Sequence, residues 1–347
     1  MSWKCFTGLT RFLSSALLGF VAWAFMSGGA AAQVVPELRI STENSPSHVQ
    51  TQVVRRFAER LQEKLSGRLK VTHFDSATLY RDRNVVQALT DGKVEMAVPG
   101  TWQLDRFEPN VGIFLLPMFY GRDAEINYRI RDEEIGQEIN RRLGDAVGAV
   151  VIGRWIDLGC ANLYSMNKPV ESHQDLVGMR IRIPGGEANA RRLKALELVP
   201  EVIAWPDLPQ AMERGKVDGV LTTHATIVSA ALWEKGIHYA FEDHQYFPQY
   251  IPILSVRFWN RLPADMQVII RETWEEGVDE ARAQAAAAQE DAARQIRAHG
   301  IAIATPAAAE LARVRERMVG SQPDLITSLG IDPALVERVE QALVARP

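Results

Sequence analysis

Short apolar runs alternate with longer amphipathic runs along the chain after residue 36. In the first half, this pattern predicts strands at residues 37–42, 69–74 and 94–98, with helices at about 45–66 and 83–89 between them. Apolar residues recur at helical spacing in the first of these helices, at Val53, Val54, Phe57, Leu61 and Leu65. The order βαβαβ is typical of α/β proteins with largely parallel strands.

The same alternation returns in a second unit, after a predicted helix at about 123–143. Here the pattern predicts strands and helices in turn, at 179–183, 187–196, 201–204, 208–214 and 219–222. Two α/β lobes are therefore the simplest interpretation. Because no low-complexity tract or Gly/Ser-rich linker separates the units, we expect several ordered segments to cross between the lobes.

Residues 264–299 contain no proline and only one glycine, Gly277. At about 1.5 Å per residue, a helix over this stretch is about 50 Å long, more than the width of one small lobe. The alanine-rich part, residues 281–293, has high helix propensity and is compatible with a solvated helix. A helix that spans both lobes is the other interpretation, and both stay open at this point.

The N-terminus has the three-part layout of a secretory signal. Lys4 and Arg11 precede an apolar run at residues 12–26, and small residues follow it up to Ala32. We predict cleavage after Ala32, which gives an exported protein. An uncleaved membrane anchor is the alternative, although the apolar run is shorter than the about 20 residues of a spanning helix.

Composition and charge narrow the class of protein. Of the 347 residues, 47% are hydrophobic and 24% are charged, as in globular proteins. The formal charge is -4, and cleavage removes two basic residues and no acidic one, which gives -6; neither value suits a nucleic-acid partner. Cleavage also removes Cys5 and leaves Cys160 alone, so no disulfide within the chain and no zinc–thiolate site is expected.

The chain lacks the common catalytic motifs. There is no G-x-G-x-x-G after a strand, no P-loop, no G-x-S-x-G and no H-E-x-x-H, and the seven histidines are scattered. We therefore expect no enzymatic activity, no cofactor and no metal ion. An exported two-lobe enzyme and a ligand sensor that acts without transport remain as alternatives.

One strand carries candidate binding chemistry. In residues 179–183, strand alternation places Arg180 and Arg182 on one face. Arg182 stands at the carboxyl end of the strand, where open α/β sheets bind their ligands. A planar guanidinium there can hold a carboxylate through two parallel hydrogen bonds. A solvated strand face is the alternative explanation of the two arginines.

Four segments, in the same order along the chain, resemble the solute-binding proteins of tripartite ATP-independent periplasmic (TRAP) transporters, the DctP family. Two of them are residues 174–184 (QDLVGMRIRIP) and 204–219 (AWPDLPQAMERGKVDG). The others are residues 79–97 (LYRDRNVVQALTDGKVEMA) and 116–119 (LPMF). The resemblance runs from about residue 38 to 320.

This resemblance implies a two-lobe periplasmic binding protein fold, type II-like, with a long helix spanning both lobes. It implies a receptor that closes on a small organic acid and delivers it to a permease of small and large membrane subunits. With residues 1–32 as signal peptide, we expect lobe I at 33–157 plus about 246–285, and lobe II at 158–245 plus about 286–347. A monomer is expected, with a dimer left open.

The resemblance also implies site residues. Arg182 takes the place of the arginine that pairs with the ligand carboxylate, and Trp205 that of an aromatic covering the ligand. Thr222 stands where many members have asparagine, and Asn162 where some carry a second arginine. Residues at loops or strand ends that face the cleft in relatives are Asn44, Trp102 and His244. A core tryptophan at 205 and a plain strand residue at 222 remain open.

Overall fold

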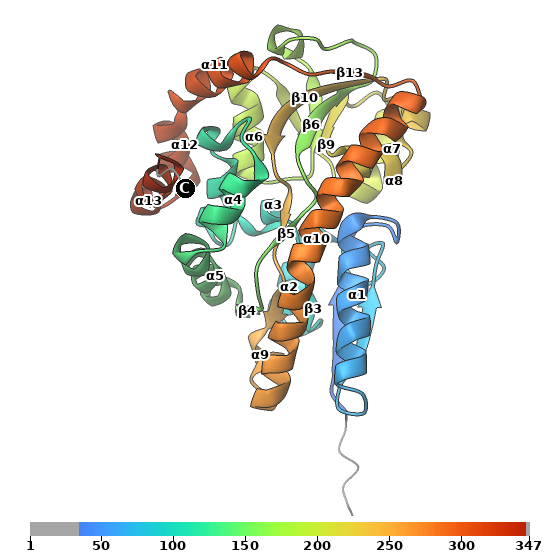
Figure 1. Ribbon diagram of the computed structural model, residues 1–347, viewed down its shortest axis with the longest axis vertical. Helices are drawn as coiled ribbons and strands as arrows, with labels where there is room; N and C mark the ends of the chain where they lie inside the picture. The colour runs from blue at the N-terminus through green and yellow to red at the C-terminus, as the bar shows by residue number, and fades with distance from the viewer. Residues whose placement is uncertain (1–34, 345–347) are drawn as a thin grey trace, which may run out of the picture. The chain divides into compact units, whose positions relative to one another are not determined.

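Two mixed β-sheets organise the protein in the computed structural model, which describes residues 35–344 (Figure 1). The predicted signal peptide lies outside the described residues. The first sheet has the strand order β2-β1-β3-β12-β4. Its strands and their connecting helices are β1 (Glu37–Ser41), α1 (Val49–Lys64), β2 (Lys70–Phe74), α2 (Asp82–Thr90), β3 (Met96–Ala97), β4 (Ala149–Val151) and β12 (Ile253–Ser255). The predicted βαβαβ half is confirmed, since β2, β1 and β3 are parallel.

The second sheet has the order β13-β10-β6-β9-β7-β8. Its elements are β6 (Ala161–Ser165), β7 (Arg180–Ile183), α6 (Glu187–Ala195), β8 (Val199–Val202), α7 (Leu208–Glu213), β9 (Gly219–Thr222), α8 (His224–Ser229), β10 (Tyr239–Tyr246) and β13 (Ala302–Ala304). Strands β8, β7 and β9 are parallel, whereas β6 lies antiparallel to both β9 and β10. In the first sheet β12 is antiparallel too. The expectation of largely parallel strands is therefore too simple, because apolar runs carry no information on strand direction.

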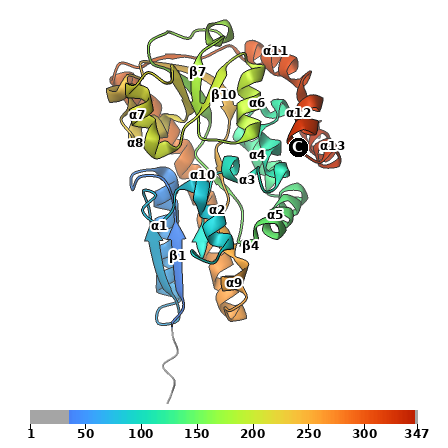
Figure 2. The same ribbon diagram turned by 180° about the vertical axis from the view of Figure 1, so that it is seen from behind.

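Three segments link the two sheets. Strands β5 (Ile156–Asp157) and β11 (Gln249–Tyr250) form a short antiparallel ribbon between them. The third segment is α10 (Ala264–Ala298), 35 residues long, which confirms the predicted uninterrupted helix. It packs against α1 beside the first sheet and α8 beside the second (Figures 1 and 2). Of the two interpretations of this helix, the one that spans both lobes is correct.

Further helices lie beside the two sheets. They are α3 (Thr101–Leu104), α4 (Ala124–Arg131), α5 (Glu134–Val147), α9 (Val256–Trp259), α11 (Ala308–Val319), α12 (Gln322–Leu329) and α13 (Pro333–Val344). Short 3₁₀ helices are η1 (Pro109–Leu115), η2 (Pro117–Phe119), η3 (His173–Leu176), η4 (Trp205–Asp207) and η5 (Leu232–Lys235). The single helix predicted at 123–143 is two helices, α4 and α5. Between them, the Asp132 carboxylate accepts two hydrogen bonds from Arg282 of α10.

The cores follow the amphipathic patterns. In the first lobe, Leu38 and Ile40 of β1 pack with Val54 and Leu61 of α1. Apolar residues of α13 also join a core cluster with residues of α5; they are Leu335, Val336 and Val339. Between residues 35 and 344, no helix combines the length and apolar character needed to cross a membrane. The residue boundaries of the lobes stay a prediction.

Gly219, the first residue of β9, is required by a close approach of two strands. A Cβ atom at this position would lie 2.1 Å from the backbone carbonyl oxygen of Tyr164 on β6. We expect Gly219→Ala to lower the free energy of unfolding by about 1–3 kcal/mol, because overpacking forces backbone shifts. Urea denaturation measures this change.

Gly277 provides the matched control, because it lies within α10 and a Cβ there would have Arg60 Nη1 as its nearest neighbour, at 3.6 Å. Gly277→Ala should raise stability by about 0.5–1 kcal/mol, since alanine favours the helix interior. Equal urea midpoints for wild type and Gly219→Ala would contradict the packing argument.

Candidate ligand-binding site

A small pocket lies between the two sheets, where β1, β7 and β9 end. Its volume is about 40 Å³. The first sheet and its helices supply Glu43, Asn44, His48, Asp82 and Trp102. The second supplies Arg182, Pro184, Trp205, Leu221, Thr222, Thr223, Thr226 and Tyr246, and the ribbon region adds Leu158, Pro248 and Tyr250. Parallel strands place their carboxyl ends at one edge, so Arg182 and Thr222 meet there.

Arg182 is a buried cation without an acidic partner. Its side chain is on β7, the residue is 4% exposed, and its Nε donates a 2.9 Å hydrogen bond to the carbonyl of Ile203. Among the described residues, no carboxylate oxygen lies within 4.0 Å of its nitrogens, and Nη1 and Nη2 make no hydrogen bond. Burial lowers the pKa of Arg182 to about 10, so the group stays charged at neutral pH. The guanidinium can therefore accept an anion.

Arg180, two residues earlier on the same strand, has a different role. Its guanidinium binds the carboxylate of Asp218 through Nε and Nη2, at 3.0 and 2.7 Å. This pair lies at the amino end of β7 and is about two-fifths exposed on each side chain. Asp218 thus pairs with Arg180 and does not line the pocket. The two arginines thus differ in burial and in pairing, and only Arg182 faces the pocket.

Aromatic rings form two walls of the pocket. The Arg182 guanidinium lies 5.4 Å from the centroid of the Trp205 ring, at a distance typical of cation–π contact. Trp205 also packs against the apolar cluster of the second lobe, so the core and the pocket share this side chain. Trp102 contacts Tyr250 edge to face, with centroids 5.2 Å apart. The Trp102 ring folds back over Gly100, where a Cβ would lie 2.3 Å from it.

Asn44 and Thr222 also line the pocket. The Asn44 amide nitrogen donates to Gln50 Oε1 at 2.8 Å and to the Tyr250 hydroxyl at 3.3 Å, which fixes its orientation. Thr222 is the last residue of β9 and pairs in register with Asn162 on β6. The structure therefore brings together five of the seven predicted site residues: Arg182, Trp205, Thr222, Trp102 and Asn44.

Asn162 and His244 are not among the residues that line this pocket. The Asn162 side-chain oxygen accepts a 3.2 Å hydrogen bond from the backbone N–H of His244. His244 lies where the pairing of β10 with β6 is irregular, and its φ is 49°. Both residues thus contact each other, and a role for either in ligand binding stays a prediction.

Two carboxyl residues and one histidine of the pocket were not predicted: Glu43, Asp82 and His48. Burial raises the pKa of Glu43, and burial and then the nearby Glu43 raise the pKa of Asp82 well above its ordinary value. Burial lowers the pKa of His48 to about 4, and His48 Nε2 is 3.3 Å from the hydroxyl oxygen of Thr226. Glu43 follows a predicted parallel strand directly, a position that favours ligand contact. No sequence signal marks Asp82 or His48.

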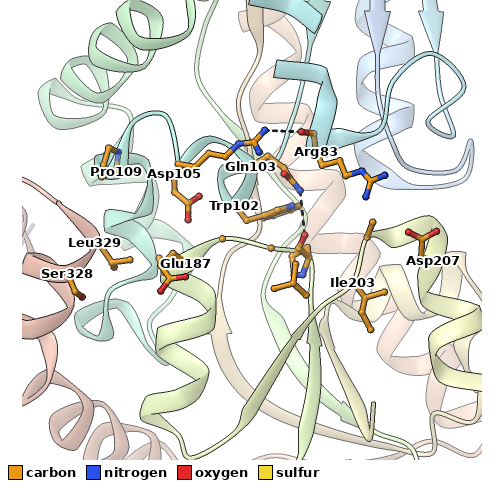
Figure 3. Close-up of a pocket in the computed structure, with 17 residues that line it drawn as sticks. Arg83, Trp102, Gln103, Asp105, Pro109, Glu187, Ile203, Asp207, Ser328 and Leu329 are labelled. Atoms are coloured by element: carbon orange, nitrogen blue, oxygen red, sulfur yellow. Dashed lines mark hydrogen bonds between the residues drawn. The ribbon is translucent and has the colours of Figure 1, made fainter. Parts of the chain in front are cut away.

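A larger cavity of about 600 Å³ adjoins this pocket and shares Trp102 and Pro184 with it (Figure 3). Its arginines, Arg83 and Arg106, are exposed, and Arg106 donates a 2.8 Å hydrogen bond to the Arg83 carbonyl. Water screens exposed charges strongly, so they attract an anion less than a buried guanidinium does. Burial of the cation, and not cavity size, marks the pocket at Arg182 as the candidate site.

Two α/β lobes with a pocket at the strand ends between them define the class of two-lobe solute-binding proteins. The comparison with protein families agrees: residues 40–322 match the DctP family, described as "Bacterial extracellular solute-binding protein, family 7". The chain belongs to this family.

Among its relatives is the C4-dicarboxylate-binding periplasmic protein DctP of Rhodobacter capsulatus, 26% identical over 275 residues, which cover 78% of this chain and 80% of the relative. A TRAP periplasmic solute-binding protein from Sulfurospirillum deleyianum, with bound succinate, has a TM-score of 0.80 at 23% identity and covers 89% and 99% of the two chains. One from Desulfovibrio salexigens, with bound orotic acid, has a TM-score of 0.80 at 24% identity, over 88% and 98%. These solved structures share the fold of this chain.

The buried, neutral His48 makes stability depend on pH. Its folded pKa of about 4 lies below the ordinary value of 6.5, so the unfolded chain binds a proton more readily. Stability should fall as the pH drops from 6.5 towards 4, by about 2 kcal/mol from this residue at about pH 5. The measurement is urea denaturation of wild type and His48→Gln across this range. Parallel pH curves for the two proteins would contradict this assignment.

Proposed function

We propose that this protein is the exported solute receptor of a TRAP transporter and captures a small organic acid through Arg182. The observation that carries the proposal is the buried guanidinium of Arg182, whose Nη atoms have no hydrogen-bond partner among residues 35–344. An unpaired buried charge is costly, and a ligand carboxylate offsets that cost with charge-assisted hydrogen bonds. Asn44, Trp102, Trp205 and Thr222 supply the surrounding polar and aromatic contacts.

Closure of the two lobes gives the receptor its mechanism. Two contacts reach across the pocket region, from His48 to Thr226 and from Arg81 to Asp207, the second at 2.9 Å. The Arg81–Asp207 pair is partly exposed and contributes little by itself. A ligand that touches Arg182 and the first lobe together favours the closed state by its differential affinity for that state.

The relatives support the choice of ligand class and of partner. The names of the similar proteins include a C4-dicarboxylate, succinate and orotic acid, all organic acids. By analogy, the proposed partners are the small and large membrane subunits of a permease. We further propose that removal of residues 1–32 releases a periplasmic receptor without enzymatic activity, with the lobe boundaries predicted above. The alternative, an enzyme or a sensor without transport, is less favoured because similar solved structures are named as TRAP periplasmic solute-binding proteins.

Arg182→Ala should abolish carboxylate binding and leave the fold intact, because the residue has no carboxylate partner to lose. Truncating one side of a buried charge pair costs about 2–5 kcal/mol, which corresponds to a loss of at least about 30-fold in affinity. Arg182→Lys should also lose most of the affinity, since an ammonium cannot reproduce the planar fork. Thermal-shift screening of organic acids on wild type finds the ligand, and calorimetry on the variants measures the loss.

Arg180→Lys is the matched control, because it makes the same substitution on the same strand outside the pocket. It should bind the ligand like wild type. If Arg182→Ala retained wild-type affinity within about threefold, Arg182 would not be the anchor.

A further inference from the structure

The part of the pocket lining that the first lobe supplies carries two buried carboxyl groups. Glu43, just after β1, is 9% exposed, and Asp82, the first residue of α2, is 5% exposed. Both belong to the first lobe, whereas Arg182 is on β7 of the second. The pocket therefore has a cationic side and an acidic side.

The two carboxyl groups are close to each other. Glu43 Oε1 lies 3.4 Å from the backbone nitrogen of Asp82, and each group is buried. Burial raises the pKa of both, and Glu43 adds to the effect on Asp82. A carboxyl group keeps acceptor oxygens in either protonation state, so the first-lobe side of the pocket offers hydrogen-bond acceptors and, among the described residues that line it, neither lysine nor arginine.

This acidic pair does not neutralise Arg182 by direct contact. Glu43 and Arg182 attract each other electrostatically, but among the described residues neither Glu43 nor Asp82 lies within 4.0 Å of the Arg182 nitrogens. His48, the other titratable group at the acidic side, is neutral because burial lowers its pKa to about 4. Outside the pocket, Arg81 and Asp207 act on Glu43 with opposite signs. The pocket space between the Arg182 guanidinium and the carboxyl pair is thus left for the ligand.

We propose that the pocket selects a monocarboxylate whose far end carries hydrogen-bond donors, hydroxyl or ammonium, over a dicarboxylate. The inference rests on the proposed function and narrows its ligand class. The ligand carboxylate binds Arg182, and the donors at its far end bind the oxygens of Glu43 and Asp82. A second ligand carboxylate would place acceptor oxygens against the acceptor oxygens of this pair, where the described lining offers no second lysine or arginine to receive them. The ligand class therefore differs from the C4-dicarboxylate and the succinate named for two relatives.

Three four-carbon acids that differ only at the far end test the proposal: succinate, 4-hydroxybutyrate and 4-aminobutyrate. Calorimetry on the full mature protein at about pH 7.5 should show 4-hydroxybutyrate or 4-aminobutyrate binding at least about tenfold more tightly than succinate. The better of these two identifies a hydroxyl or an ammonium as the preferred donor. Succinate binding as tightly as, or more tightly than, both would overturn the proposal.

Two variants of the acidic side locate the cause of the preference. Glu43→Gln and Asp82→Asn should each reduce the preference over succinate, because each replaces a carboxyl group by an amide whose nitrogen donates hydrogen bonds to a second ligand carboxylate. Glu59→Gln, an exposed position on α1, is the matched control and should leave the order of affinities unchanged. An unchanged preference in both pocket variants would overturn the role of the pair.

The binding results also distinguish a failure of the selectivity proposal from a failure of the proposed receptor function. If succinate binds best and Arg182→Ala abolishes that binding, the receptor function stands and the selectivity proposal falls. If none of the three acids binds to wild type, the selectivity proposal falls, and the proposed function falls too if the thermal-shift screen finds no organic acid that binds.

Discussion

The buried guanidinium of Arg182 is the constraint on which the rest of the site depends. A charge removed from water without a counter-ion costs free energy, and the stability of two apolar cores has to offset that cost. Strand β7 holds the residue in place through its neighbours, since Ile181 and Ile183 are buried on the opposite face. The carbonyl of Ile203 and the ring of Trp205 orient the guanidinium and leave its Nη atoms towards the pocket.

The site is complete only when the two lobes are closed, because each lobe supplies part of its lining. The first lobe brings Glu43, Asn44 and His48 to the pocket, whereas Arg182 and Thr226 come from the second. Helix α10 and the β5–β11 ribbon run past both sheets, so these segments limit how the lobes can move. Arg282 of α10 also holds two other segments to this helix, because it donates hydrogen bonds to both Asp132 and the carbonyl of Trp155. A ligand that bridges the lobes supplies the remaining contact.

Sequence reasoning succeeded where the signal is local. The uninterrupted helix α10, the βαβαβ half and the position of Arg182 at a strand end follow from periodicity and short motifs. It failed where distant segments decide the outcome: the direction of β6, β10 and β12 and the break between α4 and α5 depend on tertiary contacts. Asp82 and His48 reach the pocket only through packing of α1 and α2. The family resemblance predicts Asn162 and His244 at the cleft. Neither residue is among those that line the pocket, and the two contact each other.

The most direct test of the central claim is a structure of the mature protein with its carboxylate ligand bound. The account predicts that the ligand oxygens lie about 2.7–2.9 Å from Nη1 and Nη2 of Arg182, while Nε keeps its hydrogen bond to Ile203. A ligand carboxylate bound instead in the larger cavity, against Arg83 or Arg106, with the Arg182 guanidinium untouched, would contradict it.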